Sequence, residues 1–306
     1  MRYDRVKEHF EYFRAKGVST LLFQEDNVLS RIHRAPDGRY VFPDGRNELL
    51  AMFRLAREMG FTWEFTNGIE FGQYIHEDRV DRELIETMFW HANDNNGVTG
   101  GCYRATIPLE NLSDDRSKLF RKLKPLGEST RVIRALAETG INTLTFNLIV
   151  GRPQDDDEIL RLSHERCELV RDIVAGASPS TTVYFNVYNL SLFPGTIDYR
   201  KLKHLLAFDI ELHPEVITFY LGCLRTAHYS PLEITQLRGA LASSLNGADL
   251  IGDFDETRFI THPRFERILT RSSRVAHFDD RDESARSAAD LIAAPAADPR
   301  RLRVIS

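Results

Sequence analysis

The sequence contains few cysteines, and none is placed to form a metal or disulfide motif. Its only three cysteines, Cys102, Cys167 and Cys223, lie far apart and form no CxxC pair. A structural zinc site or a disulfide framework would need closely spaced or evenly paired cysteines. Isolated thiols are typical of the cytoplasm, where we expect this chain to be found. The ten histidines form no HxH or HExxH motif, so we expect no catalytic zinc held by the protein.

Long apolar runs and a strong charge of one sign are also missing. No apolar run approaches the ~18 residues that a membrane helix needs, so we expect no membrane partner. The N-terminus, MRYDRVKEHFEYF, mixes both charges with apolar residues and does not resemble a signal peptide. The net charge of -5 gives no electrostatic reason to expect a nucleic-acid partner.

Five apolar, β-branched runs of the kind that form buried strands are present. Their starting points lie 42, 41, 40 and 39 residues apart. The residues do not repeat at this interval, so the regularity indicates architecture and not duplication. The runs begin at Ser19, Phe61, Cys102, Asn142 and Thr181.

Segments with helical periodicity separate these runs. Glycine follows several of them directly, at Gly17, Gly60 and Gly140, as expected just past a helix end. Alternation of strand and helix predicts right-handed crossovers and a parallel sheet. We therefore predict an α/β protein, either barrel-like or doubly wound. The predicted helices are Asp4–Lys16, Asn47–Met59, Asp81–Trp90, Ser129–Glu138 and Asp156–Val174.

The alternation stops after Leu190. A Pro-Gly turn is expected over Phe193–Tyr199, followed by three helical segments and then a polar, Ala/Asp/Arg-rich tail. We therefore divide the chain into residues 1–200, a helical extension at 201–252 and an irregular tail at 253–306. The three helical segments are Lys201–Phe208, Pro214–Thr226 and Pro231–Asn246.

Polar residues follow every predicted strand. Ligands of parallel α/β folds bind at the carboxyl ends of the strands, so these positions are candidates for a binding site. Helix caps explain the same residue types, and both interpretations stay open. In the loop GRPQDDDE, Gly151 would allow a tight turn and Pro153 would open the next helix. The candidates are Gln24 to Asn27, Thr66 to Gly68, Glu110, Asn111, Asn147, Gly151 to Pro153, Asn186, Tyr188 and Asn189.

Several of these segments, taken in order, resemble the radical SAM enzymes. ETGINTLTFNLIVGRPQDDDEI is similar to their fifth-strand segment, and TLLFQEDNVL to the second strand of the cobalamin-associated branch. EFTNGIEF, YRATIPLEN and NLSLFPGTIDY resemble the third strand, the fourth strand and the turn after the sixth. The resemblance runs from about Arg2 to Tyr199.

The resemblance implies an open (βα)6 barrel that binds S-adenosylmethionine on a [4Fe–4S] cluster and generates a radical from it. It implies that Glu25 and Asp26 meet the amino group of the methionine moiety and that Asn67 lies near its carboxylate. Glu110 would hold the ribose hydroxyls, and Ile149 with Gly151 would support the adenine. On this view Gly151 lets the backbone approach a nucleoside.

The chain departs from the family at the cluster. It contains no CxxxCxxC motif and five strand units, so we expect a partial barrel with the first βα unit missing, followed by C-terminal helices. Without these thiolates the chain should not bind the cluster. Three interpretations stay open: an enzyme whose cluster loop lies upstream or on a partner chain, a degenerate member acting as a scaffold, or an unrelated α/β ligand-binding protein. A cobalamin domain could lie upstream, and the substrate, a small molecule or a peptide, is not identified.

Overall fold

The computed structural model describes residues 3–24, 27–35, 39–76, 79–94, 97–110, 126–210, 214 and 217–246. These residues fall into two compact units. Unit 1 consists of Met1–Leu148 and Arg166–Asn186, and unit 2 of Ile149–Glu165 and Val187–Ser306. The chain therefore passes between the units within two strands and one helix. The predicted tail at 253–306 lies outside the described residues.

The main sheet of unit 1 is mostly parallel, which confirms the predicted α/β class. Its strands follow the order β1-β2-β6-β7-β8, and the pairs β1–β2, β2–β6 and β6–β7 are all parallel. One short strand, β5 (His91–Asp94), runs antiparallel to β6. The five main strands are β1 (Thr20–Phe23), β2 (Thr62–Phe65), β6 (Gly97–Glu110), β7 (Thr143–Val150) and β8 (Thr182–Asn189).

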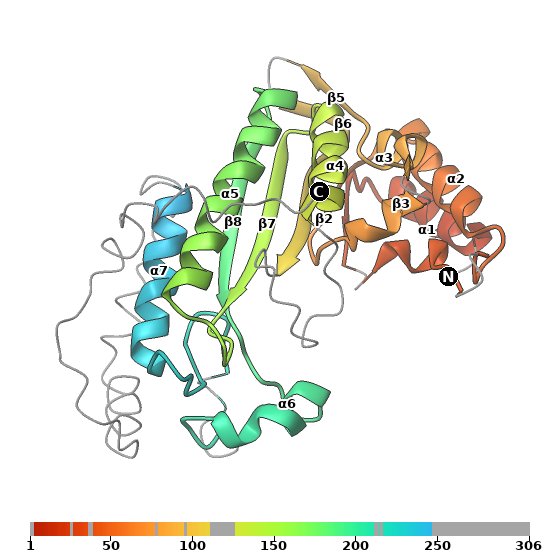
Figure 1. Cartoon of the computed structure of the whole chain (residues 1–306). Helices are drawn as coiled ribbons and strands as arrows, with labels where there is room; N and C mark the ends of the chain where they lie inside the picture. Colours follow the sequence, from red (N-terminus) through yellow and green to blue (C-terminus); the bar gives the residue numbers. More distant parts are fainter. Residues whose placement is uncertain are drawn as a thin grey trace. The chain divides into compact units, whose positions relative to one another are not determined.

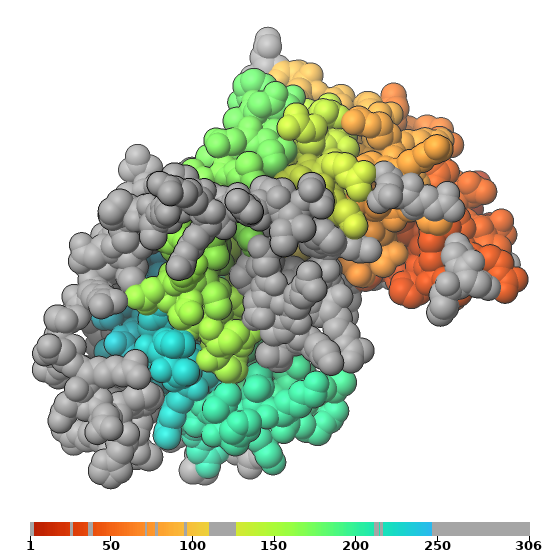
Figure 2. Space-filling model, in the orientation of Figure 1, coloured from red at the N-terminus to blue at the C-terminus, as the bar shows by residue number. Residues whose placement is uncertain are grey.

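The helices of unit 1 form where the sequence predicts them. The first four contact one another in series, and Figures 1 and 2 show the first three in red and orange. Each presents its apolar face to the core, as the 3.6-residue period requires. They are α1 (Tyr3–Ala15), α2 (Gly45–Glu58), α3 (Arg82–Met88) and α4 (Leu126–Glu138), with short helices η1 (Val28–Ile32) and η2 (Phe71–Tyr74) and a small hairpin of β3 (Ile75–His76) and β4 (Arg79–Val80). The helix α5 (Asp157–Ala177) begins in unit 2 and continues in unit 1 from Arg166.

Phe53 of α2 joins the helices to one face of the sheet. Its ring centroid lies 5.3 Å from that of Phe23, 5.7 Å from Trp63 and 5.6 Å from Phe65. The side chain is fully buried, which stabilises the fold by about 1.5–3 kcal/mol relative to exposure. This face of the sheet is therefore the apolar core of unit 1.

The hairpin of β5 and β6 was not predicted. The strand expected to start at Cys102 instead begins at Gly97. The sequence did not indicate this extension, because the polar residues before Cys102 are typical of a loop. Glycine lets the two strands approach: a Cβ on Gly101 would lie 2.1 Å from the carbonyl oxygen of Trp90. Gly101 also has a φ of +84°, which other residues rarely adopt.

Unit 2 contains α6 (Ile197–Leu202), η3 (Lys203–Leu205) and α7 (Pro231–Asn246). The helix α7 has the predicted bounds. The helix predicted from Lys201 instead begins at Ile197, inside the expected turn, because the Thr196 hydroxyl accepts a hydrogen bond from the Tyr199 amide and caps it.

The helix predicted over Pro214–Thr226 is wrong, since residues 217–226 are irregular. Carbonyl groups that a helix would use internally accept hydrogen bonds from the last residue of β8 and from the segment that follows it. The Asn189 amide nitrogen donates to the Phe219 carbonyl at 2.6 Å, and the Ser191 hydroxyl donates to Thr218 at 2.6 Å. Tertiary contacts therefore override the helical periodicity of this segment.

Pro153 does not open the next helix, although the sequence predicts that it does. It lies in a turn closed by the Asp155 amide donating to the Arg152 carbonyl, and α5 begins only at Asp157. Asp156 is the residue that caps α5, since its Oδ1 accepts from the Ile159 amide at 2.8 Å. Over the part of the chain that the structure describes, no helix is long and apolar enough to cross a membrane.

Candidate functional site

The carboxyl ends of β1, β2, β6 and β7 lie along one edge of the sheet, because these neighbouring strands are parallel. Asn67 follows β2, and Glu110 is the last residue of β6, opposite Leu148 of β7. The predicted residues Glu25 and Asp26 lie outside the described residues. The structure thus places Asn67 and Glu110 along the edge that the sequence indicated.

Polar side chains tie the loops after β1 and β2 to each other. The Asn67 Nδ2 donates to the Gln24 carbonyl at 2.7 Å, and the Asn27 Nδ2 donates to Glu70 Oε2 at 2.8 Å. The Asn27 Oδ1 also accepts from the Leu29 amide and caps η1. This bond uses one of the two Nδ2 protons of Asn67, so its side-chain amide can offer both a donor and an acceptor to a ligand.

The second face of the sheet is polar and carries a charge pair in which the glutamate is buried and the arginine side chain is 47% exposed. Glu64 of β2 is 4% exposed, and both its oxygens contact Arg104 of β6, with Nε–Oε2 and Nη2–Oε1 distances of 2.9 Å. This bidentate geometry is the strongest form of such a pair. Burial, followed by a hydrogen bond with Glu64, raises the pKa of the neighbouring Tyr103 to about 12.

Two asparagines continue the polar face toward the carboxyl edge. The Asn186 Nδ2 donates to the Asn147 Oδ1 at 2.9 Å, and Asn147 lies opposite Pro108 in the register. The sequence predicted both asparagines as site candidates. It missed Glu64 and Arg104, although a charged residue inside each apolar strand was the available signal.

Gly151, at the end of β7, is buried in unit 2 under α7. A Cβ at this position would lie 3.1 Å from Ile234 Cγ1 and 3.7 Å from Asn189 Oδ1, and its φ is +81°. Packing and backbone conformation alone therefore require glycine at this position. Ile149 lies in β7, just before it. The proposed adenine contact of Ile149 and Gly151 stays a prediction.

Two acidic residues at the start of α5 have partners inside unit 2. Arg152 and Asp155 form an ion pair with an Nη2–Oδ1 distance of 2.6 Å, and their side chains are 1% and 0% exposed. Burial raises the pKa of Asp155, while the charge of Arg152 opposes that shift. Asp157 accepts a hydrogen bond from the Tyr229 hydroxyl. These contacts hold the α5 N-terminus and are structural.

The cysteines do not fit an iron–sulfur cluster. All three are buried, and burial raises the pKa of each thiol, whereas a cluster is held by thiolates. Cys102 lies in β6, Cys167 in α5 and Cys223 in the segment before α7. Among the described residues, no three His, Cys, Asp or Glu side chains gather to hold a metal ion.

Comparison with known proteins identifies the fold. No protein-family model and no curated protein matches the sequence. Three solved structures of the cobalamin-dependent S-adenosylmethionine radical enzyme OxsB match it at 11% identity. The selenomethionine apo form has a TM-score of 0.52, and the forms with aqua-cobalamin and with aqua-cobalamin plus S-adenosylmethionine each have 0.51.

Each match covers 89% of this chain and 40% of OxsB, so the chain spans less than half the length of that enzyme. At this identity the likeness shows the fold alone. The chain therefore has a radical SAM-like α/β fold, as its motifs suggested.

Proposed function

We propose that this chain binds S-adenosylmethionine at the carboxyl edge of its sheet and serves radical chemistry on a substrate not yet identified. The observation that carries the proposal is the parallel order β1-β2-β6-β7, which gathers Asn67 and Glu110 on one edge. The neighbouring loop contributes Glu25 and Asp26, and the end of β7 contributes Ile149 and Gly151, on the sequence resemblance alone. The similarity in fold to an enzyme that binds S-adenosylmethionine supports the choice of this ligand.

The donor set suits a zwitterionic nucleoside. The Asn67 side-chain amide would donate to the methionine carboxylate, and carboxylates along the edge would accept from the ammonium group or the ribose hydroxyls. The polar face of the sheet, with the Glu64–Arg104 and Asn147–Asn186 pairs, would then face the substrate. When bound, S-adenosylmethionine would supply a radical through reductive cleavage by a [4Fe–4S] cluster.

The cluster ligands must come from residues other than the three buried cysteines. We propose that another segment or a partner chain provides them. Cobalamin, which OxsB binds, would likewise belong to a domain other than the one described.

Titration calorimetry with S-adenosylmethionine tests the proposal on the chain as it stands. We expect saturable binding that Asn67→Ala and Glu110→Gln each weaken about tenfold or more, as the loss of a hydrogen bond to a charged group predicts. Asn142→Ala and Glu138→Gln are matched controls, because Asn142 precedes β7 and Glu138 ends α4. No binding, or equal losses in the controls, would overturn the proposal.

A further inference from the structure

The outer edge of β1 has no partner strand among the described residues. β1 is the first strand in the order β1-β2-β6-β7-β8, and its only pairing in the part of the chain that the structure describes is with β2. An unpaired edge presents its backbone N–H and C=O groups to any other strand that approaches. The edge is therefore a candidate interaction surface, separate from the S-adenosylmethionine residues proposed above.

The backbone groups that stay open belong to Thr20 and Leu22. The Ser19 and Phe23 carbonyl oxygens accept hydrogen bonds from amides on the β2 side at 2.9 and 3.4 Å. Successive residues of a strand turn these groups to opposite edges. The N–H and C=O groups of Thr20 and Leu22 therefore face away from β2.

Other hydrogen bonds close both ends of this open stretch. The Val18 amide donates to the Phe13 carbonyl at 3.0 Å, and the Gln24 carbonyl accepts from the Asn67 Nδ2 at 2.7 Å. The open groups of the edge are therefore limited to β1 itself.

The side chains of β1 favour pairing. Leu22 is 53% exposed, and the strand, Thr-Leu-Leu-Phe, includes neither a charge nor a proline. Natural edge strands are commonly protected by lysine, proline or a bulge. The strand at the opposite edge, β8, has no exposed large apolar side chain. Of the two edges, β1 is therefore the one suited to a partner strand.

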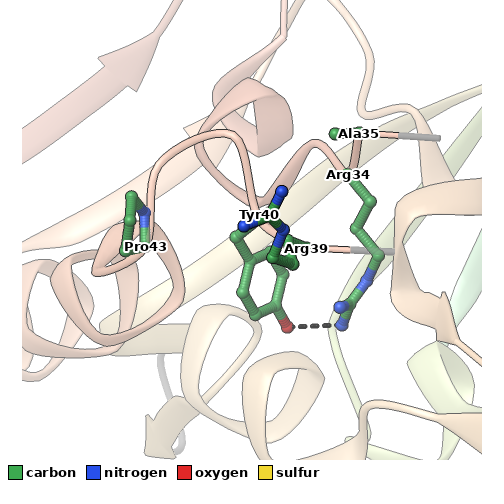
Figure 3. A pocket seen from close by; sticks show the side chains of 5 residues that line it. All are labelled: Arg34, Ala35, Arg39, Tyr40 and Pro43. Atoms are coloured by element: carbon green, nitrogen blue, oxygen red, sulfur yellow. Dashed lines mark hydrogen bonds between the residues drawn. The ribbon is translucent and has the colours of Figure 1, made fainter. Parts of the chain in front are cut away.

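The described neighbours of β1 in the chain make their contacts elsewhere. The helix α1 contacts α2, and its Phe10 packs against Phe61 with ring centroids 5.6 Å apart. In the connection from β1 to α2, Arg34 and Tyr40 form an isolated bridge with each other. The Arg34 Nη2 also donates to the Tyr40 hydroxyl at 2.6 Å (Figure 3). Neither described segment supplies a strand to the edge.

We propose that a second copy of this chain pairs with this edge, β1 against β1, in antiparallel orientation about a two-fold axis. With the axis at Leu21, Thr20 of each copy lies opposite Leu22 of the other, and reciprocal N–H···O bonds use every open group. Other symmetric registers would need the Val18 amide or the Gln24 carbonyl, which are already engaged. Because the strand is uncharged, the pairing brings no like charges together.

The dimer should be weak. The paired strand has 4 residues in each copy, whereas a stable interface uses about 20–30 residues a side. Association is therefore expected to depend strongly on protein concentration, and the gain comes from the open backbone groups and from covering Leu22.

Sedimentation equilibrium over a range of concentrations tests the dimer. The average mass should rise from 35.2 kDa toward twice that value. Leu22→Lys should raise the dissociation constant about tenfold or more, because it places like charges on both sides of the axis. Leu169→Lys, at a leucine of α5 that is 41% exposed, is the matched control and should change it less than about twofold.

Introduced cysteines test the register. Opposite residues outside the hydrogen-bonded pairs have Cα atoms about 4.5 Å apart, so Leu21→Cys should give a disulfide-linked dimer on mild oxidation with diamide. Leu22→Cys, at a more exposed position, should not, because its two copies are offset along the strands and lie more than about 7 Å apart. The natural chain, with its buried cysteines, gives the background.

The outcomes decide the proposal. A chain that stays monomeric at the highest concentration would refute it, as would equal effects of Leu22→Lys and Leu169→Lys. Cross-linking of Leu22→Cys as readily as of Leu21→Cys would refute the register and with it the two-fold pairing. S-adenosylmethionine binding is measured separately, so the two proposals fail or succeed independently.

Discussion

Ile234 of α7 faces Gly151 inside unit 2 so closely that an added Cβ would force its side chain to shift. A Cβ on Gly151 would stand 3.1 Å from Ile234 Cγ1, and one on Gly222 would stand 2.3 Å from Ile234 Cγ2. Ile234 therefore packs between two glycines. The contact explains the glycine of the GRP loop without a ligand, although it does not test whether a nucleoside also approaches there.

We expect Gly151→Ala to destabilise the protein by more than the strain of a left-handed backbone conformation alone. Gly195 is the matched control, because it has a φ of +88° and nothing within 4 Å of an added Cβ. Gly195→Ala should lower the free energy of unfolding by about 1–2 kcal/mol, the cost of a left-handed alanine. Gly151→Ala should cost about 1–3 kcal/mol more, through overpacking.

Urea denaturation of both variants measures the difference. The double variant Gly151→Ala/Ile234→Ala should cost less than the sum of the two single variants, because alanine at position 234 lacks the Cγ1 that the new methyl group would meet. Equal losses at Gly151 and Gly195 would show that the approach of Ile234 is unimportant.

The buried pair of Arg152 and Asp155 gives a second stability prediction. Asp155→Asn would leave the guanidinium of a 1%-exposed arginine without this counter-charge. Such a loss typically costs about 3–5 kcal/mol. The i,i+4 pair of Arg161 and Glu165 in α5 is the exposed control, and Glu165→Gln should cost at most about 0.5 kcal/mol. Thermal or urea unfolding of the two variants compares them, and similar losses would contradict the interpretation.

Much of the fold could be predicted from the sequence because its strands and helices have clear periods. The α/β class, the bounds of α7 and the strand ends that carry Asn67 and Glu110 all follow from local patterns. The missed features depend on contacts distant in the sequence. The segment before α7 loses its predicted helix because Asn189 at the end of β8 and Ser191 just after it donate to its carbonyl groups.

The candidate site shows the same division. Asn147 and Asn186 were predicted from their positions, but their hydrogen bond depends on the pairing of β7 and β8. Glu64 and Arg104 are 40 residues apart, and only the register of β2 with β6 brings them together. Local patterns do not encode such a partner, so a charge inside a strand remains unexplained until the register is known.

Tyr103 should make the folded protein less stable as the pH rises in the alkaline range. Its pKa is raised from 10.0 to about 12, first by burial and then by Glu64. The folded state therefore holds this proton more tightly than the unfolded state between these values, and stability falls as pH rises from about 10 to about 12. Tyr103→Phe removes this contribution. The stability of the variant should therefore fall less steeply over this pH range than the stability of the natural chain.

Urea midpoints measured from about pH 9 to about pH 12 would reveal the difference in slope, since this range spans the titration of the tyrosine in both states. Glu64→Gln should also lower the Tyr103 pKa, because it removes the charge that opposes tyrosinate formation, and absorbance titration at alkaline pH would record that shift. Identical slopes for the natural chain and Tyr103→Phe would contradict the assignment.

The three cysteines should be unreactive in the folded chain and should not assemble a cluster. Each thiol is buried with a raised pKa, so the nucleophilic thiolate is scarce near neutral pH. A disulfide reagent should therefore modify none of them at about pH 8 until denaturant is added, and then all three. Incubating the folded chain with iron and sulfide should produce no cluster absorption. A stable [4Fe–4S] spectrum that Cys102→Ser, Cys167→Ser or Cys223→Ser abolishes would contradict this expectation, because these are the only three cysteines of the sequence.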